Sequence, residues 1–185
     1  MYILGQVLGG CSTVCTIILP FFKKKWQILV LNIAVNLLIA SNLALIGQIG
    51  SGVFLCLVAV VQSIVSMNHD LKGTPILFWE KILFLVLYVG FGFFGIVTAP
   101  DFVPTINAKN LLELMPIVGA LMLMFSVFSK TEQTMRKFLL INATIWTIYT
   151  AIVGSTAFFT DLFCMCSTAA ALFKYRNKVQ EANEA

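Results

Sequence analysis

The chain has 185 residues, of which 59% are hydrophobic and 11% charged, with a formal net charge of +4 and a mean hydropathy of +0.95. Soluble domains carry roughly one-quarter charged residues, so the composition excludes a soluble protein and predicts an integral membrane protein. The basic residues cluster at the ends of apolar stretches rather than along one soluble face. This pattern predicts the lipid bilayer as partner and argues against nucleic acid.

Seven apolar stretches follow one another along the chain, and a membrane-crossing helix needs about 20 such residues. We therefore predict an all-α, polytopic membrane protein with seven transmembrane helices over residues 2–22, 26–46, 53–67, 82–98, 111–128, 138–154 and 157–173. The segments 68–75 and 129–137 are predicted to be loops, the second of them basic. The longest connection is 99–110.

The distribution of lysine and arginine predicts the orientation, because cytoplasmic loops carry the excess of these residues. With the N-terminus outside and the C-terminus in the cytoplasm, only Lys109 is left outside. The basic residues then placed inside are Lys23, Lys24, Lys25, Lys72, Lys81, Lys130, Arg136, Lys137, Lys174, Arg176 and Lys178. An even number of helices would lose this asymmetry.

The first three and the last three predicted helices share one design, with a basic inner loop followed by a short uncharged outer turn. An offset of 110 residues pairs Gly9 with Gly119 and Asn32 with Asn142. Parallel repeats of this kind occur in small transporters. We expect a 3+1+3 arrangement of two parallel three-helix-bundle repeats, in which 1–67 is the first repeat, 68–110 a linker with the fourth helix, 111–175 the second repeat and 176–185 a polar cytoplasmic tail.

Amide and aromatic side chains within the apolar stretches are the candidate substrate-binding residues. Asn142, Trp146 and Tyr149 are spaced i, i+4 and i+7 on one helix face, and Asn32 and Asn36 share a face of the second helix. A carboxamide in hydrocarbon costs roughly 1 to 3 kcal/mol unless it finds a partner. Two interpretations stay open: a midplane pocket for a small polar solute, and hydrogen bonds between helices worth about 0.6 kcal/mol each.

Asp161 and Pro116 are the candidate gating or coupling residues. Asp161 is a carboxylate one turn inside the outer end of the seventh helix, and it either gates solute or protons or caps the helix start at the interface. Pro116 removes a backbone hydrogen bond from the fifth helix and permits bending. The neighbours His69 and Asp70 lack a nucleophile, so we predict no enzyme. The five cysteines are expected to pack as small hydrophobic residues, and neither a metal nor another cofactor is expected.

Three segments of the second half carry a family resemblance: 113–121 (ELMPIVGAL), 134–136 (TMR) and 146–155 (WTIYTAIVGS). They resemble the bacterial YgjV-type inner-membrane protein family, which is similar to the larger SWEET, SemiSWEET and PQ-loop (MtN3-like) group. The resemblance implies a SWEET-like fold in the bacterial inner membrane. It also implies an asparagine where this chain has Thr150 and a glutamate where it has Asp161.

These features predict a small-solute facilitator, for a sugar or small metabolite, that works by alternating access. Asn142 and Trp146, with Asn32 and Asn36, would contact the solute, and Asp161 would shape the outer entrance. The alternative is a non-transporting membrane scaffold or sensor, which needs no cavity. Substrate, coupling ion and oligomeric state are left open by the sequence.

Overall fold

The computed structural model describes residues 2–45, 51–97, 112, 114–153 and 157–175. Within these ranges the chain is helical, which confirms the predicted all-α class. The helices are α1 (Tyr2–Ile18), the 3-10 helix η1 (Leu19–Phe21), α2 (Lys25–Leu45), α3 (Ser51–Lys72), α4 (Phe78–Val97), α6 (Leu114–Val127), α7 (Glu132–Val153) and α8 (Ala157–Lys174). The predicted connection 99–110 and the tail 176–185 lie outside the described residues.

Three helices extend further into polar sequence than predicted. α3 continues to Lys72, so His69 and Asp70 lie on a helix and the predicted loop 68–75 is largely wrong. α4 begins at Phe78, and α7 begins at Glu132 inside the predicted loop 129–137. Hydropathy indicates where the apolar stretch ends, whereas the added residues of α4 and α7 include Glu, Gln, Lys and Arg, which are good helix formers.

The first predicted membrane helix is interrupted near its C-terminal end. α1 ends at Ile18, and Pro20 lies in the first turn of η1, where a proline is tolerated because it has no backbone N–H to donate. The last carbonyl groups of a helix have no partner within the helix and need donors from elsewhere. The turn at Pro20 therefore presents carbonyl oxygens to other parts of the chain.

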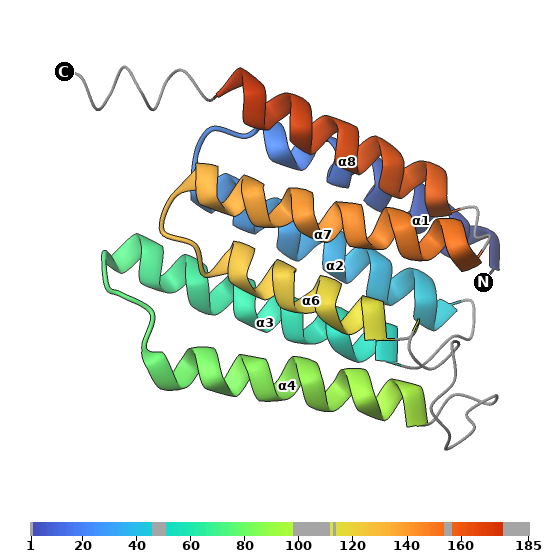
Figure 1. The fold of residues 1–185 in the computed structure, drawn as a ribbon, viewed down its shortest axis with the longest axis horizontal. Coiled ribbons are helices and arrows are strands. Elements are labelled where there is room, and N and C mark those ends of the chain that lie inside the picture. The colour runs from blue at the N-terminus through green and yellow to red at the C-terminus, as the bar shows by residue number, and fades with distance from the viewer. Residues whose placement is uncertain (1, 46–50, 98–111, 113, 154–156, 176–185) are drawn as a thin grey trace.

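The helices pack in two layers of three, with their axes roughly aligned (Figure 1). In one layer α2 packs between α1 and α3, and in the other α7 packs between α6 and α8. Between the layers, α1 contacts α8 and α3 contacts α6. α4 packs at the edge against both α3 and α6, so it touches one helix of each layer.

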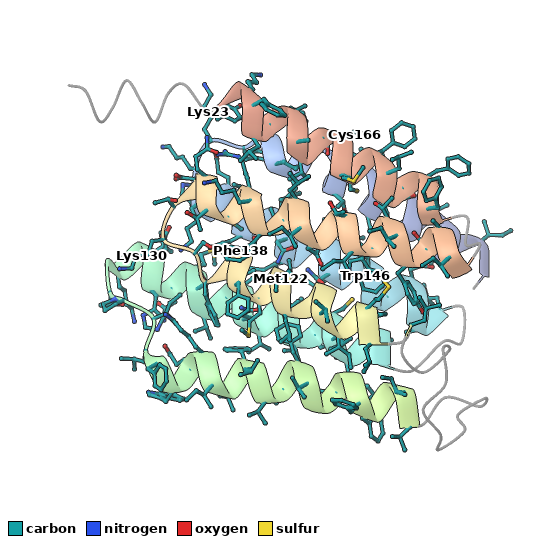
Figure 2. All side chains as sticks on the ribbon, in the orientation of Figure 1. Lys23, Met122, Lys130, Phe138, Trp146 and Cys166 are labelled. Atoms are coloured by element: carbon teal, nitrogen blue, oxygen red, sulfur yellow. The ribbon has the colours of Figure 1, made fainter. Side chains whose placement is uncertain are left out.

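One end of the bundle collects the positive charge, and we call it the basic end. Lys23 and Lys130 both lie there (Figure 2), as do the connections after α1, α3 and α6 and the end of α8. The other basic residues that begin, end or connect helices at this end are Lys24, Lys25, Lys72, Lys81, Arg136, Lys137 and Lys174. The basic connections predicted from the sequence thus lie at one end of the bundle.

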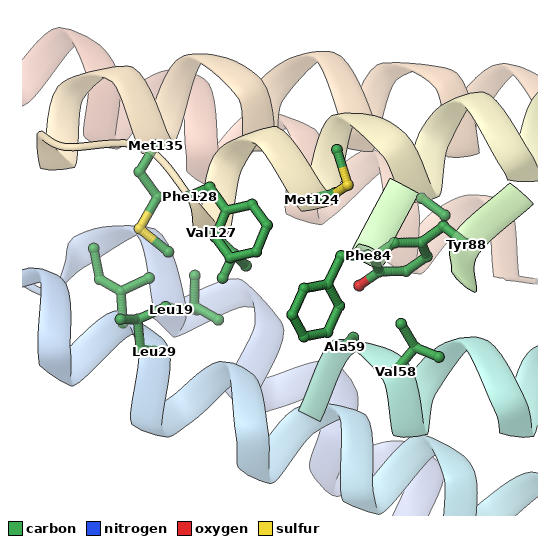
Figure 3. Packing of buried hydrophobic residues seen from close by; sticks show 12 residues of the cluster. Leu19, Leu29, Val58, Ala59, Phe84, Tyr88, Met124, Val127, Phe128 and Met135 are labelled. Carbon is green, nitrogen blue, oxygen red and sulfur yellow. The ribbon is translucent and has the colours of Figure 1, made fainter. Parts of the chain in front are cut away.

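A cluster of buried apolar side chains joins the two layers and α4 (Figure 3). Leu29 of α2, Phe84 of α4, Met124 of α6 and Met135 of α7 all belong to it. The rings of Phe84 and Phe128 meet edge to face with their centroids 5.5 Å apart. In a bilayer such contacts stabilise by close packing, because lipid tails are as apolar as the side chains themselves.

Large apolar side chains also cover the outside of the bundle. On α4, Phe78, Trp79 and Val86 are 78%, 59% and 61% exposed. Among the described residues, three helices are long and apolar enough to cross a membrane, over Ile3–Phe21, Val53–Lys72 and Phe78–Val97, and α6 is a shorter apolar helix. An apolar exterior of this extent suits a protein embedded in lipid. Seven membrane crossings remain a prediction.

Candidate functional site

The two asparagines of α2 lie at its contact with α3. Asn32 and Asn36 are only 5% and 7% exposed. Asn32 Nδ2 donates to Ser63 Oγ of α3 at 2.8 Å, and Asn36 Nδ2 donates to the Asn32 carbonyl oxygen at 2.8 Å. Ser63 Oγ in turn donates to the Ala59 carbonyl at 2.7 Å. These residues form a hydrogen-bonded group between two neighbouring helices.

Asn142 and Trp146 lie near the middle of α7 and face α6, and Trp146 is farther from the basic end than Phe138 is (Figure 2). Gly119 of α6 makes room for them, because a methyl group there would lie 2.9 Å from Trp146 Nε1 and 3.4 Å from Asn142 Oδ1. Asn142 Oδ1 is buried and has no hydrogen-bond partner within the described ranges. A buried carbonyl oxygen without a donor loses its hydration without compensation.

Gly9 of α1 and Asn42 of α2 show the same relation. A methyl group on Gly9 would lie 2.9 Å from Asn42 Nδ2, and Asn42 Oδ1 is also buried, with no partner among the described residues. In each layer, therefore, a glycine on the first helix packs closely against an asparagine on the second. The offset of 110 residues pairs Gly9 with Gly119, although it does not pair the two asparagines.

Tyr149 and Thr150 continue along α7 toward the end opposite the basic end. The rings of Trp146 and Tyr149 meet edge to face, with centroids 5.8 Å apart. One turn further, Thr150 Oγ1 donates to Asp161 Oδ2 of α8 at 3.0 Å. Thr150 and Asp161 are the two positions where the family resemblance implied other residues, so the chain differs from that pattern at two residues in contact.

The five predicted binding residues form two groups rather than one. Within the described ranges, no hydrogen bond joins Asn32 or Asn36 to Asn142 or Trp146. The first group is fully embedded between α2 and α3, whereas the second has an unsatisfied acceptor. Pro116, the other gating candidate, is half-buried in the first described turn of α6.

Several buried polar residues that connect helices were not among the predicted site residues. Gln62 of α3 is fully buried; its Nε2 donates to the Met124 carbonyl of α6 at 2.9 Å, and its Oε1 accepts from Tyr88 of α4 at 2.8 Å. Ser66 Oγ donates to the Val127 carbonyl at 2.8 Å. An amide inside an apolar stretch indicates from the sequence that Gln62 needs a partner on another helix. An isolated serine such as Ser66 gives no such indication.

Arg136 was predicted in a basic loop, and this prediction is wrong. It lies on α7 and is 3% exposed. Its Nε and Nη2 donate to the carbonyls of Pro20 and Phe22 at 3.0 and 2.6 Å, and its guanidinium lies 4.6 Å above the ring of Tyr175. The carbonyl oxygens presented at the turn of Pro20 thus explain why this basic residue points inward.

Candidate metal ligands are spread through the described residues. All five cysteines are free, and Cys11 and Cys166 are exposed. In the part of the chain that the structure describes, no group of three His, Cys, Asp or Glu side chains comes together. The chemistry available at mid-helix is hydrogen bonding by amides and hydroxyls and stacking on aromatic rings.

An all-helical bundle with an apolar exterior and amides buried at mid-helix defines the class of helical membrane proteins. A model of the Imp-YgjV family, described as bacterial inner membrane protein, matches residues 3–179. The chain therefore belongs to this family, which confirms the predicted family and the inner-membrane location. Glu113, Gly154 and Ser155 of the segments that suggested it lie outside the described residues. Neither the curated proteins nor the solved structures gave a match.

Proposed function

We propose that this protein is a SWEET-like facilitator of a small polar solute, working by alternating access, with Asn142 and Trp146 at the solute site. The observation that carries the proposal is the buried Asn142 Oδ1, which has no donor among the residues that the structure describes. A solute hydroxyl would supply that donor, and the neighbouring indole offers an apolar face for stacking. Tyr149, Asn32 and Asn36 would complete the site when the layers move relative to each other.

The helix contacts support two repeats, α1–α3 and α6–α8, joined by α4. If the first three helices are exchanged for the last three, the α1–α2 contact becomes α6–α7 and the α2–α3 contact becomes α7–α8. The α1–α8 contact becomes the α3–α6 contact, which is also present. This is the pattern expected of parallel repeats related by a two-fold axis along the membrane normal.

Hydrogen bonds between the layers at the basic end support the assignment of a closed gate there. Ser66 of α3 donates to the Val127 carbonyl at the end of α6, and Arg136 of α7 donates to the carbonyls of Pro20 in η1 and of Phe22 just after it. In the proposed cycle these bonds break when the basic end opens. The excess of basic residues favours the cytoplasm for this end, with the N-terminus outside.

Uptake by purified protein in proteoliposomes, with a panel of radiolabelled sugars and small metabolites, tests the proposal. We expect uptake of at least one solute. Asn142→Leu should reduce the rate of that uptake about tenfold or more, because losing the hydrogen bond to the solute costs more than about 1.4 kcal/mol. The matched variant Asn42→Leu removes a buried amide that lies outside the proposed site, so it should keep uptake.

A non-transporting scaffold or sensor is the second candidate. The close approach of Trp146 to Gly119 and the internal pairing of Asn32 with Ser63 favour it, because dry packing needs no solute. Absence of uptake for every solute, by protein whose helical content and unfolding temperature are intact, would support this candidate and overturn the first.

A further inference from the structure

A second polar region lies at the basic end, away from the residues assigned to solute binding. A cavity of about 450 Å³ opens between the start of α2, the end of α3, the start of α4 and the connection from α6 to α7. Its lining includes Lys25, Lys81, Lys130, His69, Asp70 and Ser129. Its volume falls within the range of about 300 to 1,000 Å³ that is typical of ligand pockets.

The charges around this cavity do not balance. The Lys25 side chain is 8% exposed, and its Nζ lies 3.4 Å from Asp70 Oδ1. An ammonium group has three N–H donors, so this one ion pair leaves donor capacity on Lys25. Lys81 and Lys130 are exposed, and neither forms an ion pair with another described residue. Three ammonium groups thus face one carboxylate.

The other nearby carboxylate is already engaged. Glu80 lies 3.1 Å from His69 Nε2, and its Oε2 also accepts a hydrogen bond from the Leu77 backbone N–H at 2.8 Å. His69 Nδ1 lies 2.8 Å from Thr74 Oγ1. These contacts fix the wall formed by the α3–α4 connection and leave Lys81 and Lys130 without an anionic partner among the described residues.

The surroundings of Lys81 are those of a membrane interface. Phe78 and Trp79, which precede it on α4, are 78% and 59% exposed. Aromatic residues of this kind concentrate at the level of the lipid headgroups. Basic pockets between helix ends on the cytoplasmic side are a recognised form of binding site for anionic headgroups.

We propose that this cavity binds a phosphate-bearing anion, with Lys25, Lys81 and Lys130 as the groups that contact the phosphate. The phosphodiester of an anionic lipid and a soluble phosphate compound share this chemistry. The site is independent of the proposed transport function. A general excess of lysine at this end does not explain it, because Lys23 and Lys24 are also exposed to solvent but lie outside the lining.

The test compares two double variants that lose the same charge at the same end of the bundle. Lys81→Gln/Lys130→Gln removes the exposed ammonium groups of the cavity, and Lys23→Gln/Lys24→Gln removes two outside it. Native mass spectrometry measures retention of phosphatidylglycerol, with phosphatidylcholine, whose zwitterionic headgroup has no net charge, as the control. Thermal unfolding in inorganic phosphate, against chloride of equal ionic strength, measures binding of a soluble anion.

We expect the wild type and Lys23→Gln/Lys24→Gln to bind phosphate in at least one of these two measurements. Lys81→Gln/Lys130→Gln should bind roughly tenfold more weakly or worse, because each lysine near the surface contributes substantially to anionic-lipid binding. Retention of phosphatidylglycerol alone identifies a lipid ligand, and stabilisation by inorganic phosphate identifies a soluble one. Binding in neither measurement, or an equal loss in both double variants, overturns the proposal.

Discussion

The Arg136 side chain connects α7 with the turn at Pro20 and with Tyr175 just after α8. Its two donated hydrogen bonds satisfy carbonyls of Pro20 and Phe22, and its guanidinium stacks on Tyr175, whose hydroxyl donates to the Phe21 carbonyl at 2.9 Å. Burial lowers the pKa of the guanidinium, while Glu132 opposes that shift. Arginine nevertheless stays charged, so these are charge-assisted bonds.

We predict that Arg136→Lys destabilises the protein by about 2 kcal/mol, because a lysine cannot reproduce two donors and a stacked plane at once. Arg136→Met should be at least as damaging. The adjacent Lys137 is exposed, so Lys137→Met is the matched control and should change stability by less than about 0.5 kcal/mol. Unfolding of the detergent-solubilised protein measures all three. Wild-type stability of Arg136→Lys would show that the hydrogen bonds contribute nothing.

The burial of Arg136 could not be predicted from the sequence, and the reason is physical. Arg136 and Lys137 are adjacent and equally basic, so composition and hydropathy treat them alike. Only the position of α7 beside the turn at Pro20 distinguishes them, and that position depends on the packing of helices more than a hundred residues apart. The inward side chain is set by its acceptors, which belong to another helix.

At the scale of helices, α4 is attached to the rest of the bundle through a close approach to α6. Gly92 is buried, and a methyl group on it would lie 2.7 Å from Ile117 Cγ1. Ile117 is itself 6% exposed and has little room to move. Gly90, on the same helix, is exposed and has no atom within 4 Å of the corresponding position.

We predict opposite effects for the same substitution at these two glycines. Gly92→Ala should destabilise the protein by about 1 to 3 kcal/mol, because the added methyl overpacks the α4–α6 contact. Gly90→Ala should be neutral or should stabilise by up to about 1 kcal/mol through helix propensity. Thermal unfolding of the two variants, measured side by side, gives the comparison. Equal unfolding temperatures for the two variants would mean that α4 does not pack on α6 through Gly92.

The spacing of polar residues predicted faces of helices but not their neighbours. The i, i+4 relation of Asn142 and Trp146 correctly placed both on one face, where they meet Gly119. The same argument could not indicate that Asn32 bonds to Ser63. Periodicity is a property of one helix, whereas the partner of a buried amide is decided by which helix lies opposite.

Over the whole molecule, the charge distribution and the helix order were the predictable features. Lysine and arginine mark the ends of apolar stretches, and the described ones gather at one end of the bundle as that pattern requires (Figure 2). The layered packing, with α4 at the edge between α3 and α6, was not predictable. It depends on contacts distributed over many small and apolar side chains, none of which is distinctive in the sequence.

The same charge distribution makes a prediction about how the molecule crosses the membrane. The positive-inside rule assigns the basic end to the cytoplasm, because that end carries the lysine excess. Green fluorescent protein fused at the C-terminus should therefore fluoresce. Alkaline phosphatase, which is active only outside the inner membrane, should be active when fused after residue 48 and inactive when fused after residue 130.

The two phosphatase fusions are matched, because both sites lie in short connections between helices of the same chain. Immunoblotting of both fusions shows whether a difference in activity reflects location rather than protein level. Activity only after residue 130 would reverse the orientation and place the lysine-lined cavity outside the cytoplasm. Activity at both positions would contradict the assignment of these connections to opposite sides, because an odd number of crossings must separate them.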